Sequence, residues 1–208
     1  MSDSFWDARY GGADYAYGTE PNDLVRDEAA RIPAGPVLCL AEGEGRNAVF
    51  LAGRGHDVTA MDRSTQGLRK ATALAAARGV PLTVVEGDLA TFDLGTGWSA
   101  IVSIWAHTPP EVRRPLHARI AAALAPGGVF VLEAYTPAQL AHDTGGPKDL
   151  ALLMTLDGLR AELTGLELAV GREVERVVRE GAFHDGPSAT VQVVARKPSA
   201  STAIRPGG

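Results

Sequence analysis

Short apolar runs alternate with amphipathic segments between residues 36 and 135. The runs that have the length and composition of buried strands are 37–41, 57–61, 82–85, 100–105 and 129–134. The segments with helical spacing between them are 47–53, 64–78 and 110–124, of which the second is bounded by Ser64 as N-cap and Gly79 as C-terminal stop. Because strands that alternate with helices favour right-handed crossovers, this pattern predicts an α/β doubly wound domain with a parallel sheet.

The pattern changes after residue 135. A glycine-rich segment at 142–147 and a short helix at 156–164 precede two long β-like runs, 166–179 and 189–197. The sequence His184-Asp185-Gly186-Pro187 between these runs is typical of a turn, so they predict an antiparallel hairpin. The expected fold is therefore Rossmann-like, with a mostly parallel seven-stranded sheet and a C-terminal antiparallel hairpin.

The length of 208 residues fits one domain with short flanking segments. Residues 1–35 are rich in aromatic residues and glycine and contain a helix start at Asn22, so we interpret them as an N-terminal cover segment. Residues 36–198 form the main domain. The tail at 199–208 is small and polar, and we expect it to be disordered.

A glycine loop follows the first predicted strand and precedes a helix. Gly43-x-Gly45-x-x-Ala48 satisfies the dinucleotide fingerprint. Asp62, at the end of the second strand, stands where an acidic residue would hold ribose hydroxyls. An NAD(P)-linked oxidoreductase is therefore one hypothesis for this chain.

The charge of this loop favours a different cofactor. A pyrophosphate would face Glu42 and Glu44, and at ~4 Å and an effective dielectric of ~20 this repulsion is about 4 kcal/mol. S-adenosylmethionine carries a sulfonium, an ammonium and no phosphate, so the same carboxylates would attract it. Asp62 would then bind the ribose, and Asp88 with Leu89 would bind the adenine after the third strand. A protein that binds this donor without catalysis is a third hypothesis.

Composition and charge exclude several classes of partner. At 45% hydrophobic and 22% charged residues the chain is an ordinary globular protein, and its net charge of -5 without a basic run argues against nucleic acid. Cys39 lies in an apolar run, where we expect a buried thiol, and no CxxC or HExxH spacing predicts a metal site. Without a signal peptide or a membrane-length apolar run, we expect a soluble, cytoplasmic protein with no membrane partner.

Residues 36–197 resemble class I S-adenosylmethionine-dependent methyltransferases through the segments VLCLAEGEGRN, VTAMDRS, VVEGDLATF, AIVSIWAHTPP and LAPGGVFVLEAYTP and the closing hairpin. The Gly-x-Gly-Arg-Asn loop, with FWDARYGGADYAYGTEPN upstream, is most similar to the small bacterial branch that includes the tellurite-resistance and, more distantly, the thiopurine methyltransferases. This resemblance implies methyl transfer from S-adenosylmethionine to a small-molecule sulfur, selenium, tellurium, oxygen or nitrogen nucleophile, with S-adenosylhomocysteine as product.

The resemblance also implies roles for individual residues. Glu42, Gly43 and Gly45 would surround the methionine end of the donor, Arg46 would brace the site through the donor's carboxylate, and N-terminal aromatic residues would cover it. Glu44 departs from the family pattern, which has a small or polar residue between the glycines. The residues assigned to the cofactor site are Trp6, Tyr10, Tyr17, Asn22, Glu42, Gly43, Glu44, Gly45, Arg46, Asn47, Asp62, Arg63, Gly87, Asp88, Leu89, Ile104 and Trp105.

The acceptor side follows the fourth and fifth strands. Trp105-Ala106-His107-Thr108 replaces the Asn-Pro-Pro-Tyr type of motif found in enzymes that methylate exocyclic amino groups of nucleic acids, which indicates a small-molecule acceptor. His107 and Tyr135 are the candidate catalytic residues. His107 would act as general base for a hydroxyl or amine acceptor, whereas a thiolate or selenide needs none; a packing role for His107 stays open. His184, at the expected hairpin tip, is expected to be solvated.

Overall fold

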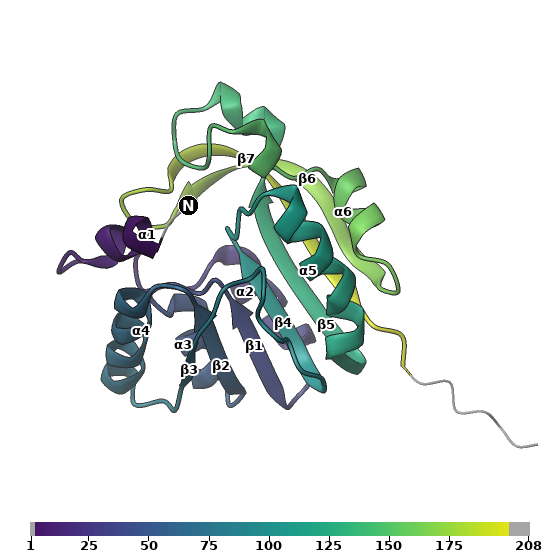
Figure 1. The fold of residues 1–208 in the computed structure, drawn as a ribbon, viewed down its shortest axis with the longest axis horizontal. Helices are drawn as coiled ribbons and strands as arrows, with labels where there is room; N and C mark the ends of the chain where they lie inside the picture. Colours follow the sequence, from purple (N-terminus) through teal and green to yellow (C-terminus); the bar gives the residue numbers. More distant parts are fainter. Residues whose placement is uncertain (1–2, 200–208) are drawn as a thin grey trace, which may run out of the picture.

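The computed structural model describes residues 3–199, so the expected disordered tail lies almost entirely outside the described residues. Its strands form one sheet in the order β3-β2-β1-β4-β5-β7-β6 (Figure 1). The strands are β1 Pro36–Leu40, β2 Asp57–Asp62, β3 Thr83–Glu86, β4 Trp98–Ile104, β5 Leu124–Tyr135, β6 Glu167–Arg179 and β7 Asp185–Arg196. Strands β1 to β5 are parallel and β7 is antiparallel to both β5 and β6. The predicted Rossmann-like fold is confirmed.

The helices cover both faces of this sheet. They are α1 Asp3–Tyr10, α2 Asp23–Glu28, α3 Arg46–Gly53, α4 Thr65–Arg78, α5 Pro110–Ala123 and α6 Leu156–Glu162, with 3-10 turns η1 Ala29–Arg31, η2 Pro137–Ala141 and η3 Leu150–Leu152. Ser64 accepts a hydrogen bond from Gly67 N–H and caps α4, which ends at the left-handed Gly79, as predicted. Among the described residues, none of the helices combines the length and apolar character needed to cross a bilayer.

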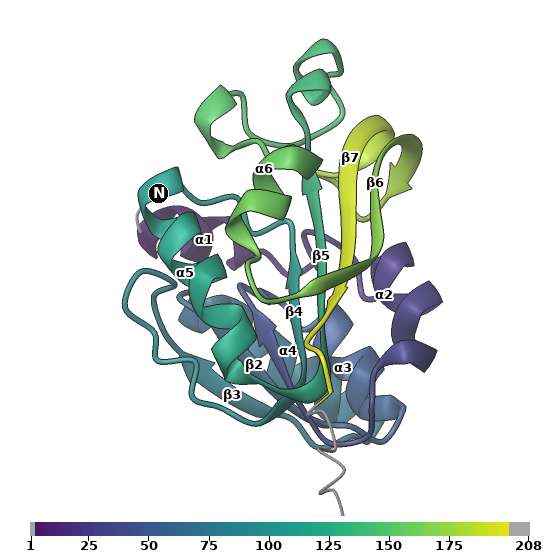
Figure 2. The same cartoon turned by 90° about the vertical axis from the view of Figure 1, so that its right-hand side faces the viewer.

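Two apolar layers explain why the central strands read as continuous hydrophobic runs. In β1, Leu38 and Leu40 pack in the layer that includes α5 and α6, whereas Val37 and Cys39 pack in the layer that includes α2 and α3. Figure 2 shows these two pairs of helices on opposite sides of the sheet. A parallel sheet that is buried on both faces has no polar face to alternate with, so its strands are apolar throughout.

The closing hairpin turns earlier than predicted. Strand β6 runs to Arg179, Glu180 N–H donates to His184 O at 2.7 Å, and β7 already begins at Asp185. Gly181 has φ of 71°, the left-handed conformation that this turn requires, so Gly181 rather than Gly186 allows the chain to reverse. The turn therefore lies at 180–184, beside the carboxyl ends of β1, β4 and β5 and close to the N-terminal segment (Figure 1).

Candidate functional site

The loop after β1 is a tight turn held against α4. Gly43 and Gly45 have positive φ angles of 61° and 91°, and a Cβ on Gly45 would lie 2.6 Å from the Ala71 side chain. Ala41 also has a positive φ of 50°, which is uncommon for a residue with a side chain. Glycine is required at position 45 both by its conformation and by the close approach of α4.

Glu42 caps the helix that follows this loop. Its Oε1 accepts hydrogen bonds from the backbone N–H groups of Asn47 and Ala48, both at 2.8 Å, while Gly45 at the N-cap has no side chain to do so. Burial raises the pKa of Glu42 to about 7, although these hydrogen bonds and the charge of Arg46 oppose the rise. The carboxyl group therefore changes its charge close to neutral pH.

Glu44 is already paired within the protein. Its carboxylate lies 2.6 Å from Lys70 Nζ on α4 and accepts from Tyr17 N–H at 3.4 Å. Arg46 pairs with Glu180 at 2.5 Å rather than with a loop carboxylate. The sequence-based argument that a phosphate at this loop would meet two unpaired carboxylates is therefore wrong for Glu44. Only Glu42 remains to favour a cationic ligand over a phosphate.

Asp62 binds the glycine loop to β2. One carboxylate oxygen accepts from Gly43 N–H at 2.8 Å and the other from Ser64 N–H at 2.8 Å. Burial raises the pKa of Asp62, and these bonds partly offset the rise. Tyr10 lies directly over this turn, because a Cβ on Gly43 would be 2.6 Å from its hydroxyl oxygen. Three predicted cofactor residues therefore meet here.

The predicted adenine side is more open. Asp88 is exposed, accepts from Ala90 N–H at 2.8 Å in a turn, and lies 3.3 Å from Arg63 Nη2. Leu89 is partly buried and packs against the core. A Cβ on Gly87 would lie 2.7 Å from the Phe92 ring, so glycine allows this close packing.

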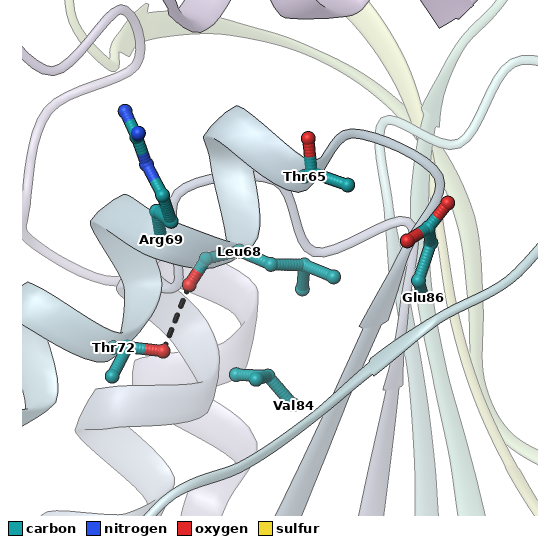
Figure 3. Close-up of a pocket in the computed structure, with 6 residues that line it drawn as sticks. All are labelled: Thr65, Leu68, Arg69, Thr72, Val84 and Glu86. Atoms are coloured by element: carbon teal, nitrogen blue, oxygen red, sulfur yellow. Dashed lines mark hydrogen bonds between the residues drawn. The ribbon is translucent and has the colours of Figure 1, made fainter.

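A surface pocket of about 360 Å³ lies next to this side, on the edge of the sheet between α4 and β3. Figure 3 shows its lining, which consists of Thr65, Leu68, Arg69, Thr72, Val84 and Glu86. No residue assigned to the cofactor lines it, but Thr65 and Glu86 adjoin Arg63–Ser64 and Gly87 in the chain. Within residues 3–199, no group of three or more His, Cys, Asp or Glu side chains is placed to hold a metal ion.

The N-terminal cover segment packs on the loop and on the hairpin turn. Trp6 stacks on Tyr10 with ring centroids 5.6 Å apart, and Tyr10 meets Tyr17 edge-on at 6.2 Å. Ala182 N–H donates to Ala16 O at 3.0 Å, which joins the cover to the β6–β7 turn. The predicted aromatic residues of the cover therefore lie over the strand ends in a closed arrangement.

Asn22 belongs to a buried polar network. It caps α2, and its side-chain amide donates to Glu133 at 2.6 Å and to Glu180 at 2.8 Å. Its backbone N–H donates to the side chain of Asn47 at 2.9 Å. Burial alone would raise the pKa of Glu180, yet the charge of Arg46 and bonded donors hold it below its usual range. The sequence placed Asn22 in the cover but gave no sign of these partners.

An aromatic cluster, defined as Tyr17, Trp105, Tyr135 and His184, lies beside this network. Trp105 stacks on Tyr135 at 4.4 Å, and the His184 ring lies 4.6 Å from Tyr17, 5.1 Å from Trp105 and 5.4 Å from Tyr135. His184 is only 7% exposed, so the expectation of a solvated histidine is wrong. The earlier turn at 180–184 carries this residue inward, and burial lowers the pKa of His184 to about 3.

His107 uses both ring nitrogens for backbone contacts. Its Nδ1 lies 3.0 Å from Trp105 O, and its Nε2 accepts from Tyr135 N–H at 2.9 Å. Burial lowers the pKa of His107 to about 4, which keeps the ring neutral. This geometry joins the loop after β4 to β5 and leaves no free lone pair for the predicted base, in agreement with the packing alternative. Ile104, which precedes the loop, is buried in the core.

Comparison with known proteins relates part of the chain to methyltransferases. A family model described as a methyltransferase domain matches residues 37–128. Among curated proteins, the 2-heptyl-1-hydroxyquinolin-4(1H)-one methyltransferase of Mycobacteroides abscessus is 33% identical over 119 residues, which are 54% of this chain and 52% of that protein. The chain thus spans about half the length of the curated relative that it matches.

Solved structures share the fold over most of the chain. A protein structure that concerns conversion of a disulfide bond into a thioacetal group in echinomycin biosynthesis has a TM-score of 0.73 and 20% identity, covering 98% of this chain and 95% of that one. TehB from Haemophilus influenzae has a TM-score of 0.70 and 18% identity, covering 94% and 66%. The glycopeptide N-methyltransferase MtfA, complexed with S-adenosylmethionine, has a TM-score of 0.61 and 24% identity, covering 88% and 96%. Because all three sequence identities are below 25%, these similarities show a shared fold and nothing further.

Proposed function

We propose that the chain transfers a methyl group from S-adenosylmethionine to a small-molecule nucleophile, a proposal supported by the methyltransferase-domain model that matches residues 37–128. The observation that carries the proposal is the turn built by Gly43, Gly45 and Asp62 at the carboxyl ends of β1 and β2. In open α/β sheets, ligands bind at this edge, next to the point where the strand order reverses. Here the order reverses between β1 and β4.

The donor is held by groups of both signs. Asp62 binds the ribose hydroxyls with the lone pairs not used by Gly43 and Ser64, and Asp88 with Leu89 binds the adenine. The ionised form of Glu42 attracts the ammonium and sulfonium of the donor. Arg46, whose buried Nη1 has no partner in the structure, binds the donor's carboxylate.

The chain's contribution to the chemistry is positioning and exclusion of water. Methyl transfer is an in-line displacement at a carbon already activated by positive sulfur, so alignment of the nucleophile accounts for much of the rate. Trp105 and Tyr135, at the ends of β4 and β5, face the acceptor side. The cover segment with Trp6, Tyr10 and Tyr17 closes the donor side against solvent.

Several acceptor atoms are compatible with this reaction. The curated relative is named for a hydroxyquinolinone substrate and MtfA for N-methylation of a glycopeptide, so both names state an organic substrate. The Gly-x-Gly-Arg-Asn loop and the fold shared with TehB support, as a further part of the proposal, membership of the small bacterial branch that includes the tellurite-resistance and thiopurine methyltransferases. Sulfur, selenium, tellurium, oxygen and nitrogen acceptors therefore belong in one screen.

Calorimetric titration separates the proposal from its two alternatives. We expect binding of S-adenosylmethionine and S-adenosylhomocysteine, and no binding of NAD or NADP, because Glu42 disfavours a pyrophosphate. Saturable nicotinamide dinucleotide binding without donor binding would support the oxidoreductase. Donor binding without acceptor-dependent S-adenosylhomocysteine across thiols, tellurite, selenite, phenols and amines would support a non-catalytic binding protein.

A further inference from the structure

Two buried polar atoms in the aromatic cluster have no hydrogen-bond partner. They are the Tyr135 hydroxyl and His184 Nδ1. Tyr135 is 0% exposed and His184 is 7% exposed. The Ser188 hydroxyl lies near the Tyr135 hydroxyl and, as a hydrogen-bond donor, partly opposes the rise in the pKa of Tyr135 that burial causes. It donates to Gly186 O at 3.1 Å, however, and makes no well-aligned bond to Tyr135. Because buried polar groups in folded proteins are nearly always paired, these two atoms in one cluster offer hydrogen-bonding capacity to a ligand.

Trp105 provides a fixed flat surface in the same cluster. It has φ of 58°, a left-handed conformation that is an outlier for a bulky residue, and such strain gathers at binding sites. Its indole Nε1 donates to Glu180 at 2.6 Å, which fixes the ring, and the residue is only partly buried. The indole is therefore preorganised to stack against another planar group.

Two of the arginines near the cluster are paired with carboxylates. The Arg46 guanidinium is paired with Glu180 at 2.5 Å, and Arg176 is paired with Glu133 at 2.8 Å. His184 is uncharged, since burial lowers its pKa to about 3. Arg9 also lies beside the cluster, where it donates to the Tyr17 hydroxyl at 3.4 Å and lies 3.7 Å from the centre of the Phe183 ring. The cluster residues themselves carry no charge, so a neutral aromatic molecule would meet rings and two neutral hydrogen-bonding atoms.

We propose that Trp105, Tyr135 and His184 form the acceptor subsite, and that it takes a planar aromatic acceptor with a neutral hydrogen-bonding group. The ring stacks on Trp105, and the polar group bonds to the Tyr135 hydroxyl and His184 Nδ1. This inference rests on the proposed methyl transfer. It specifies the acceptor as an aromatic molecule rather than tellurite or selenite.

The glycine-rich segment 142–147 bears on the same site. A Cβ on Gly145 would lie 2.9 Å from the Tyr135 hydroxyl, and a Cβ on Gly146 would lie 2.6 Å from its ring. The backbone of this segment therefore lies directly on Tyr135, beside the rings of Trp105 and His184. This cover keeps solvent from the hydroxyl, since Tyr135 is 0% exposed.

The test compares 4-hydroxyquinoline and 2-naphthol with dithiothreitol and tellurite as acceptors. Tyr135→Phe and His184→Phe keep the rings and remove one polar atom each. Each variant should weaken binding of 4-hydroxyquinoline to the S-adenosylhomocysteine complex by about tenfold, the effect of one lost hydrogen bond, and raise the KM for that acceptor similarly. Donor affinity should change by less than about twofold, a factor that corresponds to a few tenths of a kcal/mol, and dithiothreitol methylation should fall less than 4-hydroxyquinoline methylation.

His56→Asn is the matched control, because His56 Nδ1 is also buried without a partner but precedes β2 at the opposite end of the sheet. It should leave both acceptors unaffected. The subsite would be overturned if Tyr135→Phe and His184→Phe bound 4-hydroxyquinoline as well as the wild type does. It would also be overturned if these variants lost as much dithiothreitol methylation as 4-hydroxyquinoline methylation, or if the wild type preferred tellurite as acceptor. In each case donor binding and thiol methylation by the wild type would persist. Loss of donor binding in the wild-type protein would instead reject the proposed function.

Discussion

Removal of the charge of Glu42 should stabilise the free protein above neutral pH. The pKa of this carboxyl rises from 4.5 to about 7 through burial. A raised acid pKa means that the folded state binds more protons than the unfolded state between these values, so stability is highest below about pH 4.5 and falls as pH rises to about 7. At about 1.4 kcal/mol for each pH unit, the loss is about 3 kcal/mol.

Glu42→Gln keeps an acceptor oxygen for the N–H groups of Asn47 and Ala48 and removes only the charge. Chemical denaturation should therefore give this variant a free energy of unfolding about 1–3 kcal/mol above that of the wild type at pH 8, and a similar value at pH 4.5. A variant that is no more stable than the wild type at pH 8 would contradict the reasoning.

Donor binding supplies the complementary measurement. Since a cationic donor binds the ionised form of Glu42, wild-type affinity should follow its ionised fraction, from about one-tenth at pH 6 to about three-quarters at pH 7.5. The donor's own amino group titrates in both proteins, so the ratio of wild-type to Glu42→Gln affinity isolates Glu42. Calorimetry should show this ratio rise about eightfold. A flat ratio would remove Glu42 from the donor site.

The remaining predictions concern three other contacts. Asp62→Ala should weaken donor binding by at least about tenfold in calorimetry, because both the ribose contact and the bond to Gly43 N–H are lost; unchanged affinity would exclude Asp62 from the site. His107→Asn should lower thermal stability and reduce thiol and phenol methylation equally, since both ring nitrogens bind backbone; a loss confined to phenols would restore the base role. Lys70→Met should destabilise the fold by about 3 kcal/mol in denaturation, because it leaves the buried Glu44 unpaired; rescue by a second change, Glu44→Gln, is the control.

The sequence predicted the fold because its signals are local. Apolar runs show a sheet buried on both faces, and Ser64 with Gly79 limits α4 through contacts within one turn of helix. The hairpin turn was misplaced because two glycines with turn character, Gly181 and Gly186, lie five residues apart in the chain. The cover segment, which packs on Gly181 through Ala16 and Tyr17, favours the earlier turn, and that packing is not visible in the sequence.

The sequence predicted which segments come together at the candidate site, but not how its charged groups pair. Asp62, the glycine loop and the aromatic cover meet where the strand ends required, whereas the partners of the charged groups come from distant segments. Glu44 pairs with Lys70, Arg46 with Glu180, and His184 enters an aromatic cluster. The number of charged residues in a loop overestimates the electrostatic field that a bound ligand experiences. Buried carboxylates are paired with cations from other segments of the fold, which reduce that field.

Glu180 shows why single roles are hard to assign from sequence here. Its carboxylate is bonded to Arg46 of the glycine loop, Asn22 of the cover segment and Trp105 of the proposed acceptor subsite. These residues are 134, 158 and 75 positions away along the chain, so no motif contains them together. Because one carboxylate orients all three, a change at Glu180 must disturb donor and acceptor sides at once. Tyr135→Phe and His184→Phe, which remove atoms without partners, separate the two sides instead.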